Sequence, residues 1–68
     1  MLKIADNIRK LRKLRGFTQE ELAELLHLTP QAISRWETGK TMPDAERIID
    51  LAAVLNCSAD EILGISRK

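Results

Sequence analysis

Residues 18–38, TQEELAELLHLTPQAISRWET, decide the fold of this chain. Thr18 is followed three residues later by Glu21, a capping-box pattern that predicts the start of a helix. Thr29 and Pro30 begin a second helix, because threonine caps a helix N-terminus and proline is favoured at the first helical position. Leu22, Ala23, Leu25 and Leu26 form the expected apolar face of the first helix. The stretch therefore predicts two short helices joined by a tight turn near His27.

The second of these helices has two chemically different sides. At about 100° per residue, Ile33, Trp36 and Glu37 fall on one side. The other side carries Gln31, Ser34, Arg35 and Thr38. A short helix that presents hydrogen-bonding side chains outward, with apolar anchors behind it, meets the requirement for reading base edges in a DNA major groove.

The rest of the chain predicts three more helices and no strand. The first helix spans about residues 2–15 and ends before Gly16, with an apolar stripe of Ile4, Ile8, Leu11 and Arg15 flanked by Ala5 and Leu14. After a loop at residues 39–43, a fourth helix begins at Asp44, with a stripe of Ile48, Leu51, Ala52 and Leu55. A second capping box, Ser58 with Glu61, opens a brief fifth helix that ends at Gly64. We expect an all-α fold and a single domain over residues 1–68.

Composition limits the class of protein. Aromatic residues make up only 3% of the 68 residues, so ten leucines and seven isoleucines must fill most of the core. The single cysteine, Cys57, excludes an internal disulfide and suits a reducing compartment, where we expect it to pack against the core rather than sense redox state. No membrane span or signal peptide is predicted. We expect a cytoplasmic protein that is not an enzyme, because no nucleophile–base pair or metal-ligand spacing occurs, and we expect no cofactor.

The net charge of +1 conceals a polarised distribution. Residues 1–15 contain six basic side chains and one acidic one, whereas residues 16–68 contain five basic and nine acidic ones. One basic face could attract a polyanion while the protein stays soluble, and Arg9, Lys10 and Lys13 are candidates for that attraction. A solvated first helix explains the same pattern equally well.

From residue 8 to residue 63 the chain resembles the Cro/repressor-type helix-turn-helix domains, the XRE-like regulators of bacteria and phages. The resemblance rests on five motifs: residues 17–19 (FTQ), Leu22-Ala23, residues 33–37 (ISRWE), Gly39-Lys40, and Pro43 with a fourth helix that ends at residues 55–58 (LNCS). It implies a compact five-helix, lambda-repressor-like DNA-binding domain, with the helix-turn-helix at about residues 18–38 and the third helix as recognition helix. In this family, dimers bind two half-sites on operator DNA about one helical turn apart.

The resemblance also implies which residues contact DNA. The matching positions are Gln19, Thr29, Gln31, Ala32, Ser34, Arg35, Thr38, Lys40 and Thr41. We expect Gln31 and Arg35 to bond base edges and Ala32 to contact a thymine methyl. Thr29 and Ser34 suit phosphates, as does Gln19 at the start of its helix. Thr38, Lys40 and Thr41 should reach the flanking backbone.

Two further positions concern the support of the recognition helix. The family commonly joins its first and third helices through an Arg–Glu ion pair, which here would be Arg12 with Glu37. Glu37 lies on the inward side of its helix, where a carboxylate needs a partner. His27 stands where the family often has glycine in a left-handed conformation, and we expect an exposed turn residue there rather than a metal ligand. Pro30 stands where the family often has a polar residue that touches DNA.

Together these observations predict a sequence-specific transcriptional regulator that binds double-stranded operator DNA as a homodimer. We expect it to be a repressor, with no small-molecule effector and no membrane partner. Exposed apolar residues near the C-terminus, such as Val54, Ile62 and Ile65, are candidate dimer contacts. The alternative is a protein-interaction module of the same fold, such as an antitoxin or adaptor, for which an apolar outer face on the third helix would be more typical.

Overall fold

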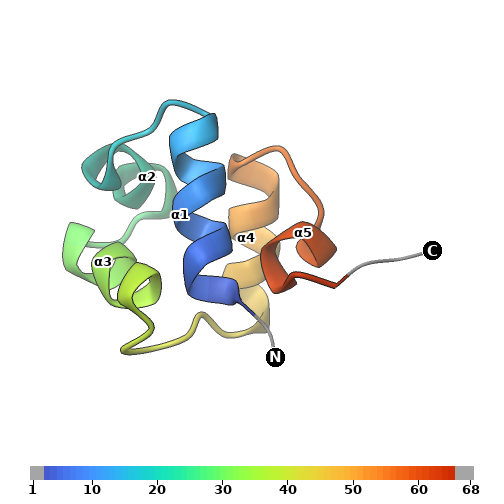
Figure 1. Cartoon of the computed structure of the whole chain (residues 1–68). Coiled ribbons are helices and arrows are strands. Elements are labelled where there is room, and N and C mark those ends of the chain that lie inside the picture. Colours follow the sequence, from blue (N-terminus) through green and yellow to red (C-terminus); the bar gives the residue numbers. More distant parts are fainter. Residues whose placement is uncertain (1–2, 66–68) are drawn as a thin grey trace.

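The computed structural model describes residues 3–65, and all regular structure within them is helical. The five helices are α1 (Ile4–Leu14), α2 (Gln19–Leu26), α3 (Pro30–Thr38), α4 (Ala45–Val54) and α5 (Ala59–Leu63). Helix α1 runs through the centre of the view in Figure 1, with α3 packed against it on one side and α5 on the other. Helix α2 packs against α3 and α4, and α4 packs against α5. The predicted all-α fold with five helices is therefore confirmed.

The predicted helix starts are formed by the expected side chains. Thr18 and Ser58 each complete a capping box, with Glu21 and Glu61 respectively. The hydroxyl of Thr29 accepts a hydrogen bond from the backbone of Ala32, and the carboxylate of Asp44 accepts one from Arg47. Each of these bonds satisfies a backbone N–H that has no partner within its helix.

The helix ends share one motif that the sequence showed only in part. At each end a backbone N–H reaches back five residues to a carbonyl, for example Phe17 to Arg12 at 3.1 Å and Leu28 to Ala23 at 2.8 Å. This bond defines the Schellman motif, which needs a residue in the left-handed conformation just before the donor. Those residues are Gly16, His27, Gly39, Asn56 and Gly64. His27, with φ of 58°, thus adopts the strained turn conformation expected of it.

The core is aliphatic, with Trp36 at its edge, and every helix contributes to it. Its buried members are Ile4, Ile8, Leu22, Ala23, Leu26, Ile33, Trp36, Leu51, Leu55 and Ile62. Cys57 packs against this core as a half-buried side chain, in keeping with the expected packing role.

Four sequence expectations about burial are wrong. Leu14 is 70% exposed, because the face of α1 that points inward carries Ile8 and Arg12. Leu25 is 50% exposed, because the face of α2 that points inward carries Leu22 and Leu26. Arg15 is exposed rather than part of the apolar stripe, and Arg12 takes the inward position instead. Ile62 is fully buried, so it cannot be an exposed dimer contact.

Candidate DNA-binding surface

Helices α2 and α3 pack closely against each other across the turn at His27. Ala23 of α2 is 1% exposed and belongs to the same buried cluster as Ile33 of α3. A larger side chain at residue 23 would force the two helices apart, since protein cores are close-packed. The relative position of α2 and α3 is therefore fixed by their own contact as well as by the turn.

The outer face of α3 is polar, as predicted. Gln31, Arg35 and Thr38 are exposed, Ala32 and Ser34 are half-buried, and Ile33 and Trp36 are buried behind them. A shallow hollow on this face is lined by Gln31, Ser34, Arg35, Thr38 and Lys40. Five of the nine predicted DNA contacts thus share one surface, and two more, Thr29 and Ala32, lie at the N-terminal end of the same helix.

The two residues expected to support α3 are in direct contact. Arg12 Nε donates to Glu37 Oε2 at 2.6 Å, and Arg12 Nη2 donates to Glu37 Oε1 at 3.0 Å. The third side of the guanidinium, Nη1, donates to the carbonyl of Phe17 at 2.8 Å. Hydrogen bonding to Glu37 raises the pKa of Arg12 above its ordinary value. The pair is buried, and Arg12 bonds both Glu37 of α3 and the carbonyl of Phe17 just before α2. These contacts hold α3 against α1 and the start of α2.

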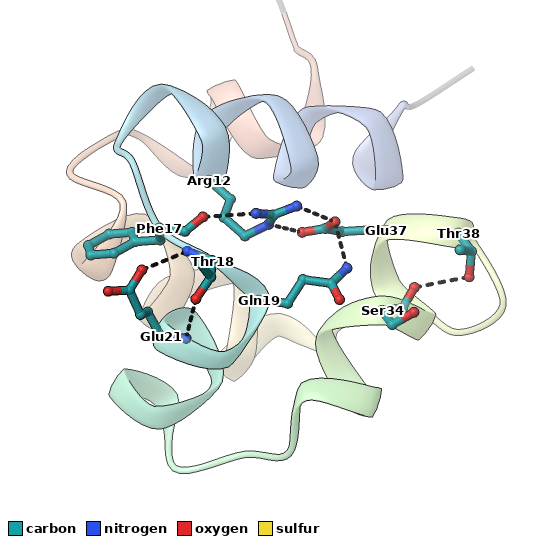
Figure 2. A network of polar contacts seen from close by, with 8 residues as sticks. All are labelled: Arg12, Phe17, Thr18, Gln19, Glu21, Ser34, Glu37 and Thr38. Carbon is teal, nitrogen blue, oxygen red and sulfur yellow. Dashed lines mark hydrogen bonds and ion pairs between the residues drawn. The ribbon is translucent and has the colours of Figure 1, made fainter.

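Gln19 joins this network through a contact that no sequence motif predicts. Its amide Nε2 donates to Glu37 Oε1 at 3.1 Å, across 18 residues of chain. Figure 2 shows Arg12, Glu37 and Gln19 meeting from three different helices. Among residues 3–65, no buried side-chain nitrogen or oxygen lacks a hydrogen-bond partner, so the network is complete as well as buried.

Two threonines on the predicted surface use their hydroxyl groups in opposite ways. The Thr29 hydroxyl accepts from the Ala32 N–H at 3.3 Å, so its own proton is available to donate to an anion such as a phosphate. The Thr38 hydroxyl donates to the carbonyl of Ser34 at 3.0 Å (Figure 2). It can therefore only accept from outside, and a phosphate contact by Thr38 would require that hydroxyl to rotate away from the helix.

The other residues expected to attract DNA or contact its backbone are exposed, whereas Arg15 is bonded within the fold. Lys40 and Thr41, after α3, and Lys10 and Lys13, on α1, are exposed, as is Arg9, whose nearest carboxylate is Asp6 at 3.7 Å. Arg15 has a role that the sequence did not suggest. Its Nε donates to the Leu55 carbonyl at 2.6 Å and its Nη2 to the Asn56 carbonyl at 3.0 Å. Arg15 thereby joins α1 to the C-terminus of α4.

Residues 8–62 match the sequence model of a family described as helix-turn-helix. The chain belongs to the Cro/repressor-type helix-turn-helix transcriptional regulators. This family consists of transcriptional regulators rather than enzymes. The regulator accordingly carries the DNA-binding fold of phage repressors, with α2 and α3 as its helix-turn-helix.

Two relatives and one solved structure illustrate the similarity. The regulator is 46% identical over 55 residues to the uncharacterized HTH-type transcriptional regulator YazB of Bacillus subtilis, covering 81% of this chain and 80% of YazB. It is 36% identical over 58 residues to the transcriptional activator BcrR of Enterococcus faecalis, covering 85% of this chain but only 28% of BcrR. The P22 c2 repressor, solved in complex with a synthetic operator, superimposes with a TM-score of 0.85 at 32% identity, over 93% of this chain and 96% of that one.

Residues 3–65 form neither a metal site nor a membrane-spanning helix. They contain no group of three or more His, Cys, Asp or Glu side chains that could hold a metal ion. None of the helices in that part of the chain is long and apolar enough to cross a membrane.

Proposed function

We propose that this regulator binds operator DNA as a homodimer, with α3 in the major groove, and acts as a repressor. The observation that carries the proposal is the outer face of α3. Gln31 and Arg35 are exposed there, while Ile33, Trp36 and the Arg12–Glu37 pair hold the helix from behind. Gln31 suits an adenine edge, and Arg35 suits a guanine edge, each through two hydrogen bonds.

The surroundings of α3 supply the expected contacts to the DNA backbone. Thr29 keeps a hydroxyl proton for a phosphate at one end of the helix, and Lys40 is exposed just beyond the other end. The operator complex of the P22 c2 repressor supports this orientation, because that protein shares the fold over nearly all of this chain. An interaction module would more typically present apolar or aromatic side chains here.

A homodimer follows from the small size of the reading element. Helix α3 has nine residues, which offers less contact than specific DNA binding normally needs, whereas two copies related by a two-fold axis double it. Ile65, 47% exposed, and the half-buried Val54 are the remaining predicted dimer contacts, since Ile62 is buried. Replacing Ile65 with Asp should shift sedimentation toward the monomer without lowering the melting temperature.

Binding to the DNA upstream of the regulator's own gene tests the proposal most directly. We expect tight binding with a clear preference over random DNA, and an affinity that falls steeply between low and moderate salt because several phosphates are contacted. Equal, weak binding to both DNAs would refute the proposal and favour an antitoxin-like or adaptor module. A reporter fused to the bound promoter then separates repression from activation, a necessary step because BcrR is an activator.

A further inference from the structure

Gln19 occupies a constrained place at the first residue of α2. Its side chain is half-buried, and its amide nitrogen lies 3.1 Å from Glu37 Oε1. Glu37 belongs to α3, so this hydrogen bond crosses from the helix expected to touch the DNA backbone to the helix expected to read bases (Figure 2). The sequence pattern places these two residues on separate helices and gives no reason for them to meet.

The chemistry of the contact fixes which way the amide faces. A carboxylate only accepts hydrogen bonds, so Gln19 must direct its NH2 group, and not its carbonyl oxygen, toward Glu37. Arg12 already bonds both carboxylate oxygens, at 2.6 and 3.0 Å, so Glu37 itself cannot turn away. One of the two amide protons of Gln19 is used in this bond, and the second remains available on the same nitrogen.

The charges around the amide also suit an anion. Glu37 would repel a nearby phosphate if it stood alone, but the Arg12 guanidinium neutralises it at bonding distance. The backbone N–H groups in the first turn of α2 add a favourable partial positive charge. A flexible glutamine side chain loses conformational entropy when it binds a phosphate. A glutamine that is already held in one position does not lose that entropy on binding.

Building on the proposed function, we propose that Glu37 is a positioning residue for DNA binding. It holds the Gln19 amide so that the free amide proton of Gln19 is ready to donate to a phosphate oxygen. Because Glu37 is part of α3, the backbone contact made by α2 and the base contacts made by α3 are then set by one rigid unit. Displacing α2 or α3 from its place on the DNA therefore weakens the contacts that the other helix makes.

The experiment uses the full chain and the best-binding duplex recovered from a random-sequence pool. Affinity is measured by fluorescence anisotropy for the wild type, Gln19→Ala, Glu37→Gln and the double variant. A hydrogen bond to a charged phosphate predicts that Gln19→Ala weakens binding about tenfold when Glu37 is present. In the Glu37→Gln background the neutral amide oxygen holds the Gln19 amide more weakly than the carboxylate does, and the same replacement should then cost less than about threefold. Equal losses in the two backgrounds would show that the bond is purely structural.

A second arm keeps Glu37 in place, because Glu37→Gln is expected to lower stability. Gln19→Asn retains the amide but is one methylene shorter, so it cannot reach Glu37 and a phosphate together. We expect it to bind as weakly as Gln19→Ala, and wild-type affinity for Gln19→Asn would overturn the proposal. Duplexes with a single neutral methylphosphonate identify the phosphate: one substitution should weaken the wild type but have no further effect on Gln19→Ala.

The two proposals fail in different ways. If the wild type recovers no preferred duplex from the pool, operator binding itself is wrong. If the wild type binds a preferred duplex but Gln19 and Glu37 act independently, only the positioning role is wrong. Nuclear magnetic resonance of the Gln19 side-chain amide in the free chain provides a direct check, since one of its two protons should be shifted and protected before DNA is added.

Discussion

Arg12 and Glu37 meet side by side, with two hydrogen bonds of 2.6 and 3.0 Å in a site almost closed to water. This geometry matches the planar guanidinium to the planar carboxylate and so fixes both position and angle. A buried pair of this kind adds little net stability over an apolar contact, but the loss of one partner leaves the other charge buried and unpaired. Its value to this regulator lies in holding α3 in one orientation.

Replacing Glu37 with Gln should therefore destabilise the fold strongly. We expect a loss of about 3 kcal/mol in the free energy of unfolding, as found when one member of a buried pair is removed. For a domain of this size, that corresponds to a fall in melting temperature of more than about 10 °C. Asp50→Asn is the matched control, because the Arg47–Asp50 pair is 3.7 Å apart and exposed. Its loss should stay within about 1 kcal/mol. Equal melting temperatures for the two variants would contradict the structural importance of the buried pair.

Arg15→Ala should also lower stability, although Arg15 is exposed. The side chain bonds two carbonyls at the C-terminus of α4, and their loss should cost about 1 kcal/mol in the free energy of unfolding. Arg9→Ala removes the same charge from the same helix, but Arg9 has only a distant pair with Asp6, so its effect should be within about 0.5 kcal/mol. Chemical denaturation of both variants measures the difference. No difference would mean that Arg15 stays solvated in solution.

The features that the sequence predicted are those decided within a few residues of chain. A capping box such as Thr18 with Glu21 spans four positions, and both predicted boxes form. The helix stop at Gly16 is local in the same way. The order and number of helices follow from such signals, which explains why the fold class was accessible without a structure.

The features that the sequence missed depend on how helices pack. The Gln19–Glu37 bond spans 18 residues and the Arg15–Leu55 bond spans 40, so no local pattern encodes them. The apolar character of Leu14 and Leu25 predicts inward positions, yet the helical phase set by buried neighbours turns them outward. Helical phase correctly predicts the inward position of Glu37, but the family resemblance, and not residue spacing, identifies Arg12 as its partner.

His27→Gly should stabilise the regulator. His27 has φ of 58°, a conformation that a side chain resists and glycine adopts freely. We expect a gain of about 0.5–1 kcal/mol in the free energy of unfolding, after allowing for the extra freedom of glycine in the unfolded chain. Glu24→Gly, at an exposed position inside α2, is the contrasting control and should cost about 1 kcal/mol. A loss of stability in His27→Gly would mean that the histidine side chain makes a favourable contact in the turn.

Cys57 should react slowly with iodoacetamide at neutral pH. Burial, followed by the nearby charge of Glu61, raises the pKa of the Cys57 thiol above its ordinary value, so less of the reactive thiolate is present than in a free thiol. Alkylation followed by mass spectrometry should be slower than for glutathione and should accelerate in urea. Because the unfolded chain loses this proton more readily, the contribution of Cys57 to stability is complete below the ordinary thiol pKa and declines as pH rises above it. Faster reaction in the folded state would contradict a raised pKa.

Arg35→Ala and Lys40→Ala should separate base reading from backbone binding. Both side chains are exposed, so neither change should lower the melting temperature appreciably. Loss of Arg35 should cost about 1–3 kcal/mol on the preferred duplex and remove discrimination at one base pair, because two hydrogen bonds to a guanine edge disappear. Loss of Lys40 should weaken binding to all duplexes alike and reduce the slope of log affinity against log salt by about 1, since one phosphate contact is lost. If Arg35→Ala instead weakens every duplex equally, Arg35 contacts a phosphate, and sequence reading rests on Gln31 and Ala32.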